Sequence, residues 1–178
     1  VKNEMYSFDK SDFISSKILF SMGIYNYSKE EMISKITESK NNKENLLYTY
    51  SKRSENTTNN REELKAILYS FLNYGVNTNN PLYGFSSCSI PIVYSDSNYC
   101  VQTFNEWMFN WARNGWIKSD KNIPENLDLI QAYYDWYQKG YRIDLRKIKG
   151  HAGNKWNEIA DQLATGKITS EEVTKIYG

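Results

Sequence analysis

The sequence has few of the residues that mark metal–thiolate centres, secreted proteins and membrane proteins. It contains two cysteines and one histidine among 178 residues. Cys88 and Cys100 fit no metal-binding spacing, so we expect free thiols and an intracellular protein. No apolar run approaches the roughly 18 residues of a membrane span, and the amino end lacks a secretory-signal pattern. We therefore expect no association with membranes.

Net charge is also nearly absent, at +1 from 22 basic and 21 acidic residues. This balance excludes nucleic-acid binding by bulk basicity and leaves a locally basic groove open. Hydrophobic residues make up 40% of the chain and aromatic residues 15%, which excludes disorder of the whole chain. The length predicts a single domain over 1–178, with a core over about 5–165 and a short helix over 170–177.

The apolar pattern along the chain predicts alternating strands and helices. We expect helices near 59–72, two or three within 98–138, one over 156–164 that stops near Gly166, and a short last helix opened by Ser170. The segments 28–45 and 75–89 are expected to be loops. Period-2 alternation and β-favouring residues predict strands over 5–9, 17–27, 46–50, 90–96 and 141–148. This order indicates an α/β fold, a mixed sheet with helices on both faces.

Four acidic side chains come from four separate predicted elements. Asp9 and Asp96 end strands, where ligands bind in open α/β sheets. Glu63 and Asp161 border the apolar stripes of two helices. Each acid taken singly has an ordinary reading as a helix cap or a solvated surface group. Taken together, the four acids indicate one shared site.

Short motifs surround these acids in a fixed order. They are TTNNREEL at 57–64, YSDS at 94–97, Trp107, Trp111 and Gly115-Trp116, GHAG at 150–153, and NEIAD at 157–161. Together they closely resemble the type 1 ribonuclease H family, which cleaves the RNA strand of RNA/DNA hybrids. The resemblance covers essentially residues 5–164. It implies a ribonuclease H-like fold with a five-stranded mixed sheet.

The resemblance also implies a two-metal carboxylate site. Asp9, Glu63, Asp96 and Asp161 match the four metal-binding acids of the family, and two Mg²⁺ ions, or Mn²⁺ in their place, are the implied cofactors. Hard Mg²⁺ prefers oxygen ligands, which suits carboxylates. The family uses a histidine at the position of His151 to assist proton movement and product departure. On general grounds a lone histidine is more often a packed or surface residue.

Polar residues near these motifs are implied to contact the hybrid. The resemblance places Thr58, Asn59 and Asn60 against the substrate, with Asn60 in the minor groove, where amides can bond to 2′-hydroxyls. The same three residues are also good helix caps. Asn157 is assigned to substrate binding by the same resemblance.

A protrusion that binds substrate in the family corresponds here to Trp107, Trp111 and Trp116. In many members it is strongly basic, whereas Arg113 is the one cation between Trp111 and Trp116 in this sequence. The alternative reading of the three tryptophans is a small hydrophobic cluster.

The sequence departs from the family at its first acid. Asp9 is followed by Lys10 and Ser11 where the family has Gly-Ser, and Asp12 is the alternative first ligand. The leading hypothesis is a monomeric, metal-dependent endonuclease whose partner is an RNA/DNA hybrid. The alternative is a hybrid- or RNA-binding module of the same fold with impaired catalysis, because loss of one metal ligand can leave binding intact.

Overall fold

The computed structural model describes residues 18–20, 23–25, 48–49, 54–79, 90–150 and 155–177. Several features predicted from the sequence lie outside these residues. They are the strand 5–9, the loop 28–45, the loop residues 80–89, and the side chains of Asp9, Asp12, Cys88 and His151. Cys100 is described, and it is a buried free thiol.

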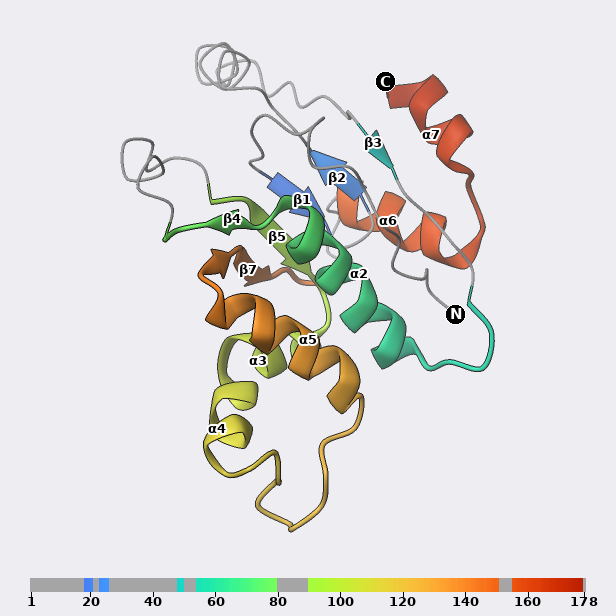
Figure 1. Cartoon of the computed structure of the whole chain (residues 1–178). Helices are drawn as coiled ribbons and strands as arrows, with labels where there is room; N and C mark the ends of the chain where they lie inside the picture. The colour runs from blue at the N-terminus through green and yellow to red at the C-terminus, as the bar shows by residue number, and fades with distance from the viewer. Residues whose placement is uncertain are drawn as a thin grey trace.

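Five short strands form a mixed sheet in the order β3-β2-β1-β5-β7 (Figure 1). Their bounds are β1 Ile18–Phe20, β2 Gly23–Tyr25, β3 Tyr48–Thr49, β5 Ile92–Ser95 and β7 Asp144–Lys147. β2 runs antiparallel to β1 and β3, whereas β5 runs parallel to both β1 and β7. A separate two-stranded sheet joins β4, Val76–Asn77, to β6, Tyr141–Arg142.

The prediction of one long strand over 17–27 is wrong, because this segment contains two strands. β1 and β2 pair with each other in antiparallel register, with Ile18 opposite Tyr25 and Leu19 opposite Ile24. A fully extended segment of that length would project far beyond the four residues of β5 that can pair with it. The reversal lets both halves of the segment form ladder hydrogen bonds within a narrow sheet.

The predicted strand over 141–148 is likewise divided. β6 pairs with β4, with Tyr141 opposite Asn77, and β7 pairs with β5 after a break at Ile143. The two halves therefore satisfy their backbone groups in different sheets. Alternation of side chains continues through such a break, which is why the sequence pattern alone does not reveal it.

The helices agree closely with the predicted pattern. α2 begins after the N-cap Thr58, whose hydroxyl accepts a hydrogen bond from the backbone N–H of Arg61 at 3.1 Å. α6 ends before Gly166, which has a φ of +77° that favours glycine. The helices are α2 Asn59–Tyr74, α3 Asn98–Gln102, the π-helix η4 Thr103–Trp107, α4 Met108–Arg113, α5 Leu127–Gln138, α6 Lys155–Thr165 and α7 Ser170–Tyr177.

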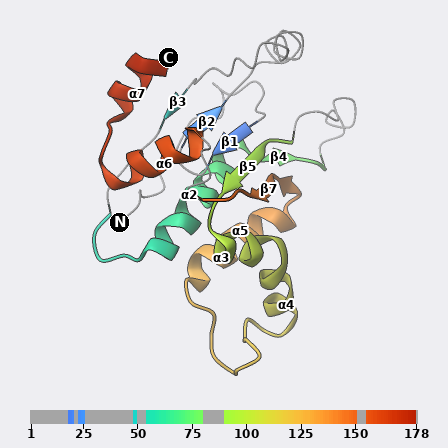
Figure 2. The same cartoon turned by 180° about the vertical axis from the view of Figure 1, so that it is seen from behind.

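Helices cover both faces of the sheet. α2 and α5 lie on one face and α6 on the other, as the two opposite views show (Figures 1 and 2). Successive residues of β5 follow this division, because Val93 belongs to the core under α2 and α5 and Tyr94 packs with Trp156 of α6. Within the described part of the chain, no helix is both long and apolar enough to cross a bilayer.

Stacked aromatic rings form the centre of the larger core. The ring of Tyr133 on α5 lies 4.2 Å from that of Phe71 on α2 and 4.1 Å from that of Phe104 on η4, measured between centroids. All three side chains are buried. Burial also raises the pKa of the Tyr133 hydroxyl. This stack fixes α2 and α5 relative to the helical segment that follows β5.

We expect Phe104→Ala to lower the free energy of unfolding by about 3–5 kcal/mol, because it leaves a cavity between two packed helices. Urea denaturation followed by circular dichroism measures this change. Ile123→Ala is the matched control, since Ile123 is 68% exposed and its truncation should change stability by less than about 0.5 kcal/mol. A loss below about 1 kcal/mol for Phe104→Ala would show that the stack is not the centre of the core.

Candidate active site

Asp96 stands immediately after β5, at the carboxyl end of a strand flanked by two parallel neighbours. The next residue, Ser97, is the N-cap of α3, and its hydroxyl accepts from the N–H of Cys100 at 3.2 Å. The N–H of Ser97 in turn donates to the hydroxyl of Ser95. Capping is therefore done by Ser97, and the carboxylate of Asp96 is available for other contacts.

Two residues hold or crowd the Asp96 carboxylate. Asn157, which is buried on α6, donates from Nδ2 to Oδ2 of Asp96 at 3.2 Å. Gly150 approaches the same carboxylate so closely that a Cβ there would lie 3.3 Å from Oδ2. Since Gly150 precedes His151 in the sequence, the chain enters the histidine motif beside Asp96. Asn157 thus has a contact within the protein, and its contact with substrate stays a prediction.

A cavity of about 220 Å³ lies between the end of β5 and α6. Its polar lining consists of Asp96, Asn157, Glu158, Asp161, Gln162 and Lys167. The structure therefore brings together two of the four predicted acids, one from a strand end and one from a helix. Every described residue of the lining has a polar or charged side chain, so the cavity suits a hydrated, charged ligand.

Lys167 is a member of this cavity that the sequence analysis missed. It follows the glycine turn that ends α6, and its backbone N–H donates to the carbonyl of Gln162 at 2.9 Å. A cation beside two carboxylates can offset part of their repulsion and can attract a phosphate. For the other cavity residues the helix period was an available signal, because Glu158, Asp161 and Gln162 share one face of α6.

Glu63 lies on α2, where its side chain is buried. It does not line the cavity, but Ala66, one turn further along α2, forms a small buried cluster with Ala160 and Ala164 of α6. This contact brings the helix of Glu63 against the helix of Asp161. Among the described residues, no three His, Cys, Asp or Glu side chains gather closely enough to bind one metal ion.

Glu62, beside Glu63, is completely buried, which the sequence analysis did not predict. Its Oε1 pairs with Nζ of Lys65 at 3.2 Å. The pair lies within one helix turn, so the charge of Glu62 is compensated locally.

The donor chemistry at this site fits Mg²⁺. Asp96 and Asp161 offer carboxylate oxygens to the cavity, and none of the described lining residues is a soft sulfur ligand. Mg²⁺ binds through one or two carboxylates and keeps several waters, which a cavity of this size can hold. These two residues would hold the ion in the described part of the chain.

The segment 58–60 lies open to solvent at the amino end of α2. Thr58 is the helix cap, whereas Asn59 and Asn60 are the first residues of the helix. The Asn60 carbonyl lies 3.9 Å from Sγ of Cys100 on α3. The capping prediction is confirmed for Thr58, and the amides of Asn59 and Asn60 are left exposed at the surface.

The three tryptophan rings make two ring contacts in this segment. Trp107 and Trp111 approach with ring centroids 6.1 Å apart, and Trp116 meets Tyr134 of α5 edge to face at 5.2 Å. Trp111 and Trp116 are half-buried and pack against the main core. Arg113 is exposed and its guanidinium hydrogen-bonds the side chain of Asn110. The hydrophobic reading is thus confirmed for Trp111 and Trp116, and contact with substrate stays a prediction.

Comparison with known proteins adds to this geometry. The profile of the RNase H family matches residues 17–169. The chain belongs to the RNase H family. The match begins after Asp9 and Asp12, so neither candidate for the first acid lies within it.

Individual members of the RNase H family share more than a third of the aligned residues. A ribonuclease H of Thermoanaerobacter sp. (strain X514) is 37% identical over 132 residues, which cover 69% of this chain and 76% of that protein. A ribonuclease H of Caldanaerobacter subterraneus subsp. tengcongensis is 39% identical over 118 residues, covering 64% and 67%.

Two solved structures support the fold. The foamy viral protease–reverse transcriptase in complex with an RNA/DNA hybrid is 14% identical, with a TM-score of 0.58, covering 93% of this chain and 21% of that one. The solution structure of the PFV RNase H domain is 20% identical, with a TM-score of 0.54, covering 70% of this chain and 73% of that one. The predicted ribonuclease H-like α/β fold is therefore confirmed.

We expect the double change Ala112→Lys and Asn114→Lys to strengthen binding of an RNA/DNA hybrid at low salt. Each new phosphate contact should steepen the dependence of log affinity on log salt by roughly 0.9 or less. Fluorescence anisotropy with a labelled hybrid at several salt concentrations measures the slope. An unchanged affinity and slope would show that this RNase H chain does not meet its substrate through the tryptophan segment.

Proposed function

We propose that this chain hydrolyses the RNA strand of RNA/DNA hybrids with a carboxylate site that binds two divalent metal ions, acting as a monomeric single domain. As a member of the RNase H family it is an endoribonuclease that acts on RNA/DNA hybrids. To this activity the proposal adds the residues of the site and the two metal ions that they bind. The observation that carries it is one cavity that Asp96 of the strand end and Asp161 of α6 both line, beside Asn157.

The proposed ligands are Asp96, Asp161, Glu63 and the first acid, Asp9. Asp12 is the alternative for this last position. When bound, paired Mg²⁺ ions activate a water and stabilise the leaving oxygen of the phosphodiester. Mn²⁺ has the same preference for oxygen ligands and would serve in their place.

Residues around the carboxylates have supporting roles. The Asn157 amide restrains Oδ2 of Asp96, so the second oxygen is the one that is free to bind a ligand. Lys167, at the rim of the same cavity, would attract the scissile phosphate. His151 follows Gly150, which lies against Asp96, and would move a proton as product leaves.

Substrate contacts are proposed along the amino end of α2. Asn59 and Asn60 are exposed one turn before Glu63, so a hybrid that bound there would run toward the carboxylates. Amide side chains both donate and accept hydrogen bonds, which suits the 2′-hydroxyls that distinguish RNA from DNA.

A second candidate is a hybrid-binding module with impaired catalysis. One observation favours it: the family match begins at residue 17, after both candidates for the first acid. A site with three acids would bind metal more weakly and would leave hybrid binding largely intact.

Incubation of an end-labelled RNA/DNA hybrid with the protein tests the two candidates. We expect cleavage of the RNA strand in Mg²⁺, no cleavage when EDTA is added, and no cleavage of duplex DNA. Asp96→Asn should lower the rate at least about 100-fold while the hybrid still binds, because a neutral amide replaces a charged metal ligand. Gel analysis of the products and an anisotropy titration measure the two properties.

Asp144→Asn provides the matched control. It makes the same change at the opposite end of the sheet, where Asp144 pairs with Ile92, and it should cleave like the wild type. Wild-type binding without cleavage would favour the impaired module. A rate within tenfold of wild type for Asp96→Asn would contradict the proposed site.

A further inference from the structure

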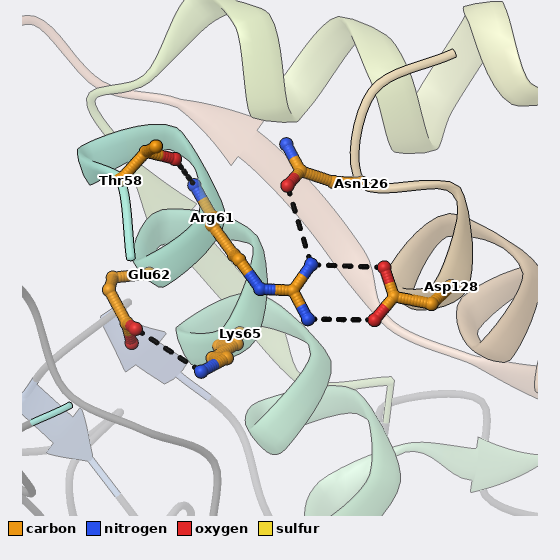
Figure 3. Close-up of polar contacts among 6 residues, drawn as sticks. All are labelled: Thr58, Arg61, Glu62, Lys65, Asn126 and Asp128. Atoms are coloured by element: carbon orange, nitrogen blue, oxygen red, sulfur yellow. Dashed lines mark hydrogen bonds and ion pairs between the residues drawn. The ribbon is translucent and has the colours of Figure 1, made fainter. Parts of the chain in front are cut away.

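Arg61 joins the amino ends of two helices that are far apart in the sequence (Figure 3). Its Nη1 donates to Oδ1 of Asp128 at 3.0 Å and its Nη2 to Oδ2 at 2.7 Å. Nη1 also lies 3.4 Å from Oδ1 of Asn126. The planar guanidinium therefore contacts two residues at the start of α5 with one rigid group.

The α2 end of this bridge belongs to the proposed substrate segment. Arg61 follows Asn60 directly, and its own N–H is the group that Thr58 caps. Glu63 comes two residues later on the same helix. The backbone of Arg61 thus bonds to the segment 58–60, and its side chain bonds to α5.

The α5 end of the bridge leads toward the tryptophans. Asn126 has a φ of +58°, so the chain turns sharply into α5 at this residue. Further along α5, Tyr134 meets the ring of Trp116 edge to face, with centroids 5.2 Å apart. The ring of Tyr99 meets that of Trp107, with centroids 6.2 Å apart.

The bridge contributes geometry more than stability. The Asp128 side chain is 62% exposed, and exposed ion pairs have little effect on the free energy of unfolding. Each partner favours the charged form of the other: Asp128 raises the pKa of Arg61, and Arg61 lowers the pKa of Asp128. The pair is therefore fully ionised at neutral pH, and two parallel hydrogen bonds fix its orientation.

We propose that Arg61 is a positioning residue that holds the segment 58–60 at a set distance from the tryptophan segment 107–116 through Asn126 and Asp128. This inference rests on the proposed function and on the predicted contact of the tryptophan segment with the hybrid. Loss of the bridge lets the two segments separate, and a hybrid that spans them binds less well.

The direction in which Asp128→Asn changes the affinity for the hybrid separates a positioning role of Arg61 from a direct contact with the hybrid. Asp128→Asn removes a negative charge, so electrostatics alone would leave polyanion binding unchanged or make it tighter. Positioning predicts weaker binding, because Arg61 loses its charged partner. We expect the dissociation constant for the hybrid to rise roughly three- to tenfold in both Arg61→Gln and Asp128→Asn.

Anisotropy titrations in EDTA measure these constants without cleavage, and the double variant completes a thermodynamic cycle. The double variant should bind no more weakly than Arg61→Gln, because both changes break one bridge. Arg61→Lys keeps the charge but loses the planar guanidinium that makes two parallel hydrogen bonds, and it should also weaken binding. With Mg²⁺, we expect KM to rise and kcat to stay within about twofold.

Asp144→Asn and Arg146→Gln break the matched control pair, which is also 2.7 Å long and lies on β7. Neither should change hybrid affinity. Unchanged affinity in Arg61→Gln and Asp128→Asn would overturn the inference, as would weaker binding in Arg61→Gln with wild-type or tighter binding in Asp128→Asn. A wild type that binds hybrid without cleaving it would contradict only the proposed function, and one that binds no hybrid would contradict both.

Discussion

Burial of α2 on nearly every side is the constraint on which the rest of the structure depends. Its apolar residues pack against the sheet and α5, while Ala66 faces α6. Two of its buried polar side chains bond within the helix: Ser70 donates to the carbonyl of Ala66, and Asn73 to that of Tyr69. These contacts hold the body of α2, and Arg61 joins its exposed amino end to α5.

The candidate site follows from where α2, β5 and α6 meet. β5 runs parallel to β1 and β7, its end lies beside α6, and the Asn157 amide donates to Asp96 across that junction. Nearby carboxylates repel one another when no cation lies between them. Packing of the elements offsets that repulsion, because the buried contact of Ala66 with Ala160 and Ala164 holds α2 against α6.

Local patterns allowed the helices to be predicted from the sequence. Leu64, Ile67 and Phe71 recur at helical spacing, and α2 carries them over the expected range. The strands were less predictable, because alternation continues through a reversal such as the one between β1 and β2. Which strand pairs with which is a tertiary property that the alternation does not encode.

Contacts between distant residues were beyond sequence reasoning. Arg61 and Asp128 are 67 positions apart, and nothing in either local pattern indicates that they pair. Lys167 joins the cavity through a turn whose geometry depends on Gly166. Asp96 and Asp161 were predicted to converge because both lie at the ends or borders of regular elements, and the cavity brings them together.

The central claim is that Asp96 and Asp161 act as one metal-binding set. Melting temperature in EDTA and in saturating Mg²⁺ tests it directly, since a ligand that binds only the folded state stabilises that state. The account predicts that Mg²⁺ raises the melting temperature of the wild type and of Asp144→Asn, and that Asp96→Asn and Asp161→Asn each lose most of the rise. An equal rise in all four proteins would contradict it.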